Sequence, residues 1–160
     1  MPFPTLANAM GGPSEVEIAG VAIGAEFIGE ISPSVSPVLR TSERQSGTTT
    51  RPTNLLDNPE YSFPLYLNSY LDLQYIFPDA YDGTAVVAGT STCSLPEPVE
   101  VIFRGKCSPT GDTVVMPKAY VTFEDNLARN GTDDRGVTVH VYPQPNEEGS
   151  IRYGGDGESS

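Results

Sequence analysis

The chain has 160 residues, of which 38% are hydrophobic, and its 21 acidic and 9 basic side chains give a formal net charge of −12. This length fits one domain with its own core. The charge excludes a protein that grips a nucleic-acid backbone, because such binding needs basic side chains that displace counterions. For an isolated acidic protein plain solubility is the commoner explanation, and the alternative is that the acidic side chains prevent adhesion to DNA. The 16 glycines and 15 prolines are typical of short strands joined by turns.

Two cysteines, Cys93 and Cys107, are too few for a disulfide-stapled scaffold, and with a single histidine they match no zinc pattern. We favour free thiols, and a disulfide between the two is the alternative. Residues 1–15 lack the basic and apolar regions of a secretory signal. No stretch has the roughly 20 apolar residues of a membrane span. We therefore expect no membrane segment and a protein made and used in a cytoplasm.

The first predicted elements are an N-terminal arm and a pair of strands. Residues 1–14 are rich in proline, glycine and small side chains, which predicts an extended arm. We expect the domain itself to span residues 15–145. Apolar and polar side chains alternate around Val16 and again over 27–31, so the sequence predicts two strands with a turn or bulge near Gly20.

A polar segment follows at residues 42–55, which carry almost no apolar side chain before Leu55. Such a segment cannot stabilise its own order by burial. We predict a long projecting loop or ribbon, of a length that is usually functional or disordered within a compact domain. Three basic side chains lie in it or beside it: Arg40, Arg44 and Arg51.

An apolar strand and a helix are predicted next. In residues 61–67, every second side chain from Tyr61 is apolar, and Pro64 indicates an edge position where a missing N–H is harmless. Residues 69–77 predict the one α-helix, with Ser69 as its cap. We expect two apolar rows of this segment to pack on a sheet: Leu67, Leu71 and Tyr75, and Leu73 with Phe77.

The rest of the domain predicts an antiparallel meander. Residues 84–91 are a candidate short strand, and three clear strands follow over 97–105, 113–126 and 136–143. Pro117 predicts a break or bulge in the middle strand of these three. The connection before the last strand is polar and contains an Asn-Gly turn signal.

These elements predict the fold class. It is mostly β, an antiparallel β-sandwich or barrel with one flanking α-helix, a long extended loop and terminal arms. Residues 146–160 have the composition of a flexible C-terminal tail. We find no internal repeat and no second domain.

No motif for catalysis or metal binding is found. His140 lies on the polar face of a predicted strand without a nucleophile that can be placed beside it, so we interpret it as a surface side chain. Asn130, Asp133 and Asp134 lack the spacing of a calcium loop. The glycines around Gly20 lack the lysine of a phosphate-binding loop. We predict no enzymatic activity, no catalytic residue, no metal and no cofactor.

The order of the elements resembles a known family. An N-terminal strand pair leads into "GEISPSVSPVLRT", a polar loop, an apolar strand, a helix ending in "LQYIFPDAYDG" and the final meander. This resembles the major tail protein, the tail-tube subunit, of bacteriophages with long non-contractile tails. The resemblance runs from about Val16 to about Tyr142. It is strongest in "LQYIFPDA" and in "VVMPKAYVTFEDN" with the loop that follows.

The resemblance implies a function in the virion tail. Six copies would join their sheets into a ring, and rings assembled in the host bacterial cytoplasm would stack into a tube through which genomic DNA passes without specific binding. The implied partners are other copies of the chain and the tape-measure, terminator and tip proteins. The loop 42–55 and both terminal arms would contact the next ring. The candidates for inter-ring contact are Arg40, Arg44 and Arg51, and those for the lumen or a ring junction are Glu124, Asp125, Asp133 and Asp134.

Two other interpretations stay open. One is another small virion protein, either a capsid-decorating or a tail-completion protein, which would form trimers or single rings instead of tubes. The other is a β-sandwich that binds carbohydrate or peptide on an aromatic platform. Its platform would consist of Tyr66, Tyr70, Tyr75 and Tyr81.

Overall fold

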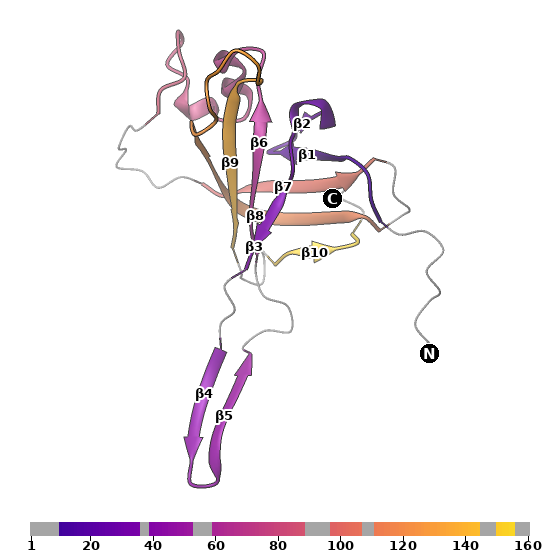
Figure 1. The fold of residues 1–160 in the computed structure, drawn as a ribbon, viewed down its shortest axis with the longest axis vertical. Helices are drawn as coiled ribbons and strands as arrows, with labels where there is room; N and C mark the ends of the chain where they lie inside the picture. Colours follow the sequence, from indigo (N-terminus) through magenta and orange to yellow (C-terminus); the bar gives the residue numbers. More distant parts are fainter. Residues whose placement is uncertain are drawn as a thin grey trace.

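The chain folds into one large antiparallel sheet and a separate two-stranded hairpin (Figure 1). This computed structural model describes residues 10–35, 39–52, 59–88, 97–106, 111–144 and 150–155. The sheet has the strand order β2-β1-β7-β8-β9-β6-β3, with β10 beside β8, so the predicted mostly antiparallel β class is confirmed. Its strands are β1 (Ser14–Ile18), β2 (Val21–Ile23), β3 (Ser32–Ser34), β6 (Glu60–Tyr66), β7 (Val99–Gly105), β8 (Thr113–Glu124), β9 (Gly136–Pro143) and β10 (Arg152–Tyr153). The hairpin consists of β4 (Leu39–Arg44) and β5 (Gly47–Pro52).

The sheet folds over on β8. The first half of this strand pairs with β7 and β10, and the second half, from Ala119, pairs with β9. The register against β7 shifts between Val99 and Val101, where β8 holds an extra residue at Pro117 and Lys118, so the predicted bulge is confirmed. As a result β6 and β9 run along the long axis of the molecule, whereas β7 runs across it (Figure 1). A bend of this kind lets one strand serve both layers of a sandwich.

The core lies between the inner faces of these two layers. Val137, Val139 and Val141 of β9 point inward as predicted and are fully buried, while Thr138 and His140 between them are partly exposed. Phe63 and Leu65 of β6 pack in the same cluster. Its other buried members are Val16, Ile18, Ile23, Leu73, Val101, Phe103, Met116 and Ala119.

The predicted edge position of β6 is wrong, because β9 pairs with it on one side and β3 on the other. The proline is tolerated for a related reason. The Pro64 carbonyl accepts a hydrogen bond from the N–H of Gly29 at 2.9 Å. The N–H and C=O of one strand residue point to the same side. The backbone nitrogen of Pro64, which has no hydrogen to donate, therefore faces Gly29 and not β9. The pairing of β3 with β6 ends before this position, at Ser62, so no hydrogen bond to β9 or β3 is lost.

The predicted α-helix is a shorter 3₁₀ helix, η2 (Tyr70–Tyr75). Ser69 caps it as predicted, since its Oγ accepts from the N–H of Leu71 at 3.2 Å. Pro78 disfavours α geometry at Phe77 and stops the helix before an α-helix can propagate. Leu73 is buried, and Phe77 packs against Phe123 with ring centroids 4.7 Å apart and ring planes at 45°.

The prediction that Leu71 and Tyr75 pack inward is wrong, because their side chains are 45% and 63% exposed. The predicted apolar rows assumed an α-helix, which has 3.6 residues per turn. A 3₁₀ helix has 3.0 residues per turn, so positions four apart do not share a face. The tighter winding therefore leaves two apolar side chains on the surface.

The predicted strand around Val16 is β1, but its hairpin partner is β2 and not the predicted segment 27–31; Val16 of β1 pairs with Ile23 of β2. Ala19 and Gly20 turn the chain between them with φ of 51° and 83°. The prediction of a strand over residues 27–31 is wrong. A 3₁₀ helix, η1 (Ala25–Phe27), occupies the start of that segment, and β3 begins only at Ser32.

A turn at Asp82 is formed by its own side chain, whose Oδ1 accepts from the N–H groups of Thr84 and Ala85 at 2.8 Å each. It follows a second short helix, η3 (Pro78–Ala80). Of the candidate strand 84–91, the described part forms only an isolated bridge between Val86 and Tyr81. Residues 89–91, both cysteines and residues 1–9 of the predicted arm lie outside the described residues.

The predicted C-terminal tail differs from the structure where the chain is described. Arg152 and Tyr153 form β10 against Val115 and Val114 of β8. The N–H of Gly154 adds a 2.7 Å hydrogen bond to a carbonyl of β8. Tyr153 also hydrogen-bonds Tyr61, which packs edge-on against Phe103. This part of the C-terminal segment is thus attached to its own domain.

We expect the protein to lose stability above pH 10. Burial, and then the hydrogen bond with Tyr153, raise the pKa of Tyr61 above its ordinary value of 10.0. The folded chain therefore holds this proton more tightly than the unfolded chain, so stability is unchanged below pH 10 and falls above it. The fall stays under about 1.4 kcal/mol per pH unit for one proton. Urea unfolding from about pH 8 to about pH 11 measures it. Tyr61→Phe should flatten the curve, and Tyr75→Phe, at an exposed position, should leave it unchanged.

Candidate functional site

The β4–β5 hairpin projects away from the sheet at one end of the long axis (Figure 1). All of its side chains that the structure describes, residues 39–51, are exposed. A two-stranded hairpin without a buried face is at best marginally stable in water. The ribbon predicted over 42–55 corresponds to this hairpin, which spans residues 39–52 and lacks a packing partner among the described residues; residues 53–55 lie outside them.

One face of this hairpin is basic. Arg40 pairs directly with Arg51 across the two strands, and side chains two residues apart lie on the same face. Arg44 therefore shares this face with both of them; we call it the arginine face. Among the described residues none forms an ion pair with these three arginines. The opposite face carries Leu39 and Glu43 with threonines, two of which, Thr41 and Thr50, place their hydroxyls 3.4 Å apart.

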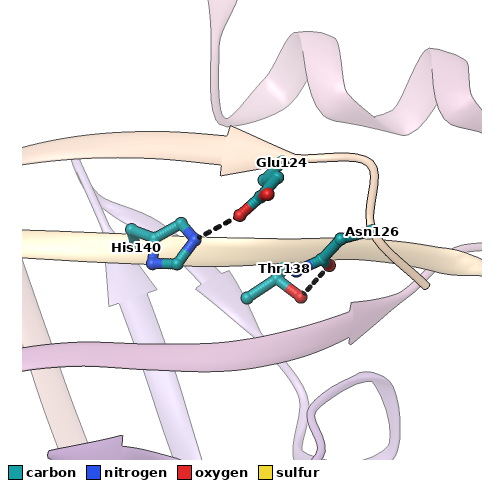
Figure 2. A network of polar contacts seen from close by, with 4 residues as sticks. All are labelled: Glu124, Asn126, Thr138 and His140. Atoms are coloured by element: carbon teal, nitrogen blue, oxygen red, sulfur yellow. Dashed lines mark hydrogen bonds and ion pairs between the residues drawn. The ribbon is translucent and has the colours of Figure 1, made fainter.

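The four acidic candidates lie together in and beside the connection from β8 to β9. Glu124 ends β8 and its Oε2 lies 3.1 Å from Nε2 of His140 on β9 (Figure 2). Beside it the hydroxyl of Thr138 donates to the side-chain oxygen of Asn126 (Figure 2). These two contacts fasten the start of the connection to the outer face of β9.

Asn130 shapes the rest of the connection. Its Oδ1 accepts from the N–H groups of Thr132 and Asp133 at 2.9 and 2.7 Å, and its Nδ2 donates to Asp133 at 2.7 Å. Arg129 lies 4.0 Å from Asp125. Its guanidinium also stacks on the ring of Tyr70, 5.5 Å from the centroid. The connection is therefore tied to η2.

Acidic side chains dominate this end of the molecule. We call residues 67–88 and 124–135 the acidic end; together they contain seven acidic and two basic side chains. The hairpin, residues 39–52, contains three basic side chains and one acidic. The hairpin thus has a charge of +2. Since the net charge of the chain is −12, all residues outside the hairpin together have a charge of −14.

The acidic end and the hairpin lie at opposite ends of the long axis (Figure 1). β6 links them. Its first residue, Glu60, pairs with Ser34 of β3, where the chain leaves for the hairpin. Its last residue, Tyr66, pairs with Gly136, where the acidic connection enters β9. At about 3.3 Å per residue, this strand alone separates the two exits by about 20 Å.

The four tyrosines of the proposed binding platform do not form one exposed surface. Tyr70 and Tyr75 are exposed, whereas Tyr66 and Tyr81 are half-buried. Tyr66 and Tyr75 line a small groove described below, and Tyr70 faces Arg129.

Other kinds of site were sought in the same residues. Within the described ranges, no three side chains of histidine, cysteine, aspartate or glutamate gather as metal ligands would. None of the helices in that part of the chain has the length and hydropathy needed to cross a membrane.

The sequence predicted the acidic cluster and the basic segment but missed their relation. Arg40, Ser42 and Arg44 alternate with Leu39, Thr41 and Glu43, which is a signal for a strand with one basic face. The placement of this face opposite the acidic end depends on the pairing of β3, β6 and β9, which no local pattern contains. Comparison of the sequence with protein-family models and with curated proteins gives no match.

Proposed function

We propose that this chain is a structural virion protein, the tail-tube subunit of a bacteriophage with a long non-contractile tail. Its copies form rings of six that stack into a tube in the host bacterial cytoplasm, and the tube conducts the genome. The role is structural and needs no catalytic residue and no cofactor. Its partners are other copies of itself and the tape-measure, terminator and tip proteins.

One observation carries the proposal: a basic hairpin and an acidic end lie at opposite ends of one long axis. A surface that complements a different surface on an identical molecule makes heterologous contacts, which close into a ring when the rotation between copies closes and otherwise repeat along an axis. Stacking copies along the long axis brings the arginine face of one copy toward the acidic end of the next. The hairpin, marginally stable alone, gains a partner in the stack.

The overall charge supports passage of DNA. With −14 outside the hairpin, the body of each copy repels phosphate, and a repulsive wall lets a polyanion slide instead of adhering. Glu124, Asp125, Asp133 and Asp134 are our candidates for the lumen or the ring junction. The arginines of the hairpin, in turn, are masked by acidic partners in the stack.

The test is the shape of the assembled protein and its dependence on salt. Negative-stain microscopy of the purified chain should show hollow tubes. Light scattering should show slower assembly as salt rises from about 0.1 M to about 1 M, because the Debye length falls from about 10 Å to about 3 Å and weakens the contacts. Trimers or single rings would identify a capsid-decorating or tail-completion protein instead. Tubes that assemble at the same rate at every salt concentration would refute the electrostatic contact between the arginine face and the acidic end.

A further inference from the structure

An apolar groove opens at the acidic end, between β2 with η1 on one side and η2 on the other. Its volume is about 200 Å³. Small-molecule sites usually measure roughly 300–1,000 Å³, so this groove fits one or two side chains of a protein partner better than a free ligand. It is lined chiefly by Val21, Ile23, Phe27, Leu65, Leu67 and Ile76.

Apolar surface continues from the groove onto η2. Tyr75 lines the groove and is 63% exposed, and Leu71 on the same short helix is 45% exposed. The groove is continuous with the candidate stacking surface, because the stacking of Arg129 on Tyr70 and the hydrogen bond from Leu67 N–H to the Arg135 carbonyl join the groove side to the acidic connection.

The opposite end of the molecule offers a matching apolar side chain. Leu39 lies at the base of the hairpin, on the face away from the arginine face, and is 56% exposed. Val35, at the end of β3, is 48% exposed. A copy displaced along the long axis thus presents the arginine face on one side of the hairpin and Leu39 on the other. The acidic connection and the groove lie side by side to receive them.

We propose that the groove binds the hairpin base of a second copy of this chain, with Leu39 as the inserted side chain. This inference rests on the proposed head-to-tail assembly. The charges set the approach and the register of the two copies, whereas the apolar contact supplies the salt-independent part of the interaction. Contact of the incoming hairpin with the exposed Tyr75, and with Leu71 nearby on η2, removes apolar surface of the acidic end from water.

Cysteine cross-linking tests the contact. Leu39→Cys and Tyr75→Cys chains, both with Cys93→Ser and Cys107→Ser, are purified separately, mixed under assembly conditions and oxidised. A disulfide forms only where Cα atoms come within about 7 Å, so a cross-linked pair of chains should be the main product. Met10→Cys, also at an exposed apolar position, replaces Leu39→Cys in the control. A stronger cross-link from Met10→Cys would place the N-terminal segment in the groove and overturn the assignment.

A second variant separates this inference from the proposed function. Leu71→Asp with Tyr75→Asp should abolish tubes at all salt concentrations, while Val87→Asp, at an exposed position that does not line the groove, should leave them intact. If tubes form with unchanged salt dependence in the groove variant, the groove contact is wrong and the proposed function stands. If the unmodified chain forms no tubes, both are wrong.

Discussion

Reversing the charges at either end of the molecule is expected to stop assembly, and reversing both is expected to restore it. The first set replaces the three arginines of the hairpin (Arg40→Glu, Arg44→Glu and Arg51→Glu) and changes the hairpin charge from +2 to −4. The second set, Glu124→Lys, Asp125→Lys and Asp134→Lys, changes the charge of the acidic end from −5 to +1. Either set alone juxtaposes like charges, which costs several kcal/mol. At about 1.4 kcal/mol per tenfold, the concentration needed for tubes should rise on the order of 100-fold or more. The combined variant keeps the net charge of −12 and should form tubes.

The positions are chosen so that the variants fold alike, because Glu124 and Asp125 lose only surface contacts, with His140 and Arg129, and such contacts are worth little. Arg40 and Arg51 face each other across the hairpin, so changing both preserves a like-charged pair and leaves the stability of the hairpin comparable. Asp133 is kept, because its side chain accepts from Asn130 and helps to order the connection. Circular dichroism confirms folding, and light scattering with microscopy reads out assembly. A combined variant that stays monomeric while both parents are folded would contradict the proposed contact between the ends.

Strand patterns were readable from the sequence because burial on one face imposes a period of two residues. Val137, Val139 and Val141 are all buried, and the bulge at Pro117 lies where a missing N–H and a fixed φ demand it. The same rule failed over residues 27–31. There the alternation includes Gly29, which lies against the Pro64 ring: a Cβ at this position would meet the ring at 2.3 Å. Its close approach to Pro64 explains that glycine, and the pairing with β6 there is limited to an isolated bridge between Ile28 and Leu65.

The helix shows a different limit of sequence reasoning. Apolar spacing and the Ser69 cap predicted a helix in the right place, and Leu73 with Phe77 do pack inward. The helix η2 has only six residues before Pro78 follows, which are too few for an α-helix to propagate. Because the 3₁₀ helix winds more tightly, Leu71 and Tyr75 do not lie on the predicted packing face. Tyr75 lines the groove, and Leu71 is exposed on the same short helix. The wrong prediction of an α-helix and the failure to predict the groove therefore have one physical origin, the 3₁₀ winding of η2.

The candidate residues were predicted one by one, but their spatial relation was not. Charge and turn composition identified Asp125, Asp133 and Asp134 as an exposed cluster and the three arginines as part of a projecting segment. Their positions at opposite ends follow from β6, which receives the chain from the hairpin at Glu60 and ends beside β9 at Tyr66. Such long-range pairing is set by the whole core, so it becomes visible only in three dimensions.

Gly136→Ala is expected to destabilise the fold more than any surface change described above. Gly136 is buried at the first residue of β9, where it pairs with Tyr66. A Cβ there would lie 1.9 Å from the Leu65 carbonyl oxygen and 2.9 Å from the Tyr66 Cα. Both are backbone atoms of β6, so relief of the clash requires the neighbouring strands β9 and β6 to separate. We expect a loss of about 3 kcal/mol, which for a chain of this size lowers the Tm by about 6–12 °C.

Gly131→Ala is the matched control, because a Cβ at that position meets nothing within 4 Å. Its effect should stay within about 0.5 kcal/mol. Urea unfolding with a constant slope m checks both variants, and equal midpoints would contradict the close approach of β9 to β6. Assembly should follow stability here, since Gly136 is the point at which the acidic connection joins the core. The strand β6 fixes the distance between the acidic end and the hairpin. Separation of β9 from β6 therefore loosens the position of the acidic end relative to the hairpin. Gly136→Ala tubes should therefore require more protein even below the melting temperature, whereas Gly131→Ala tubes should form as in the unmodified chain.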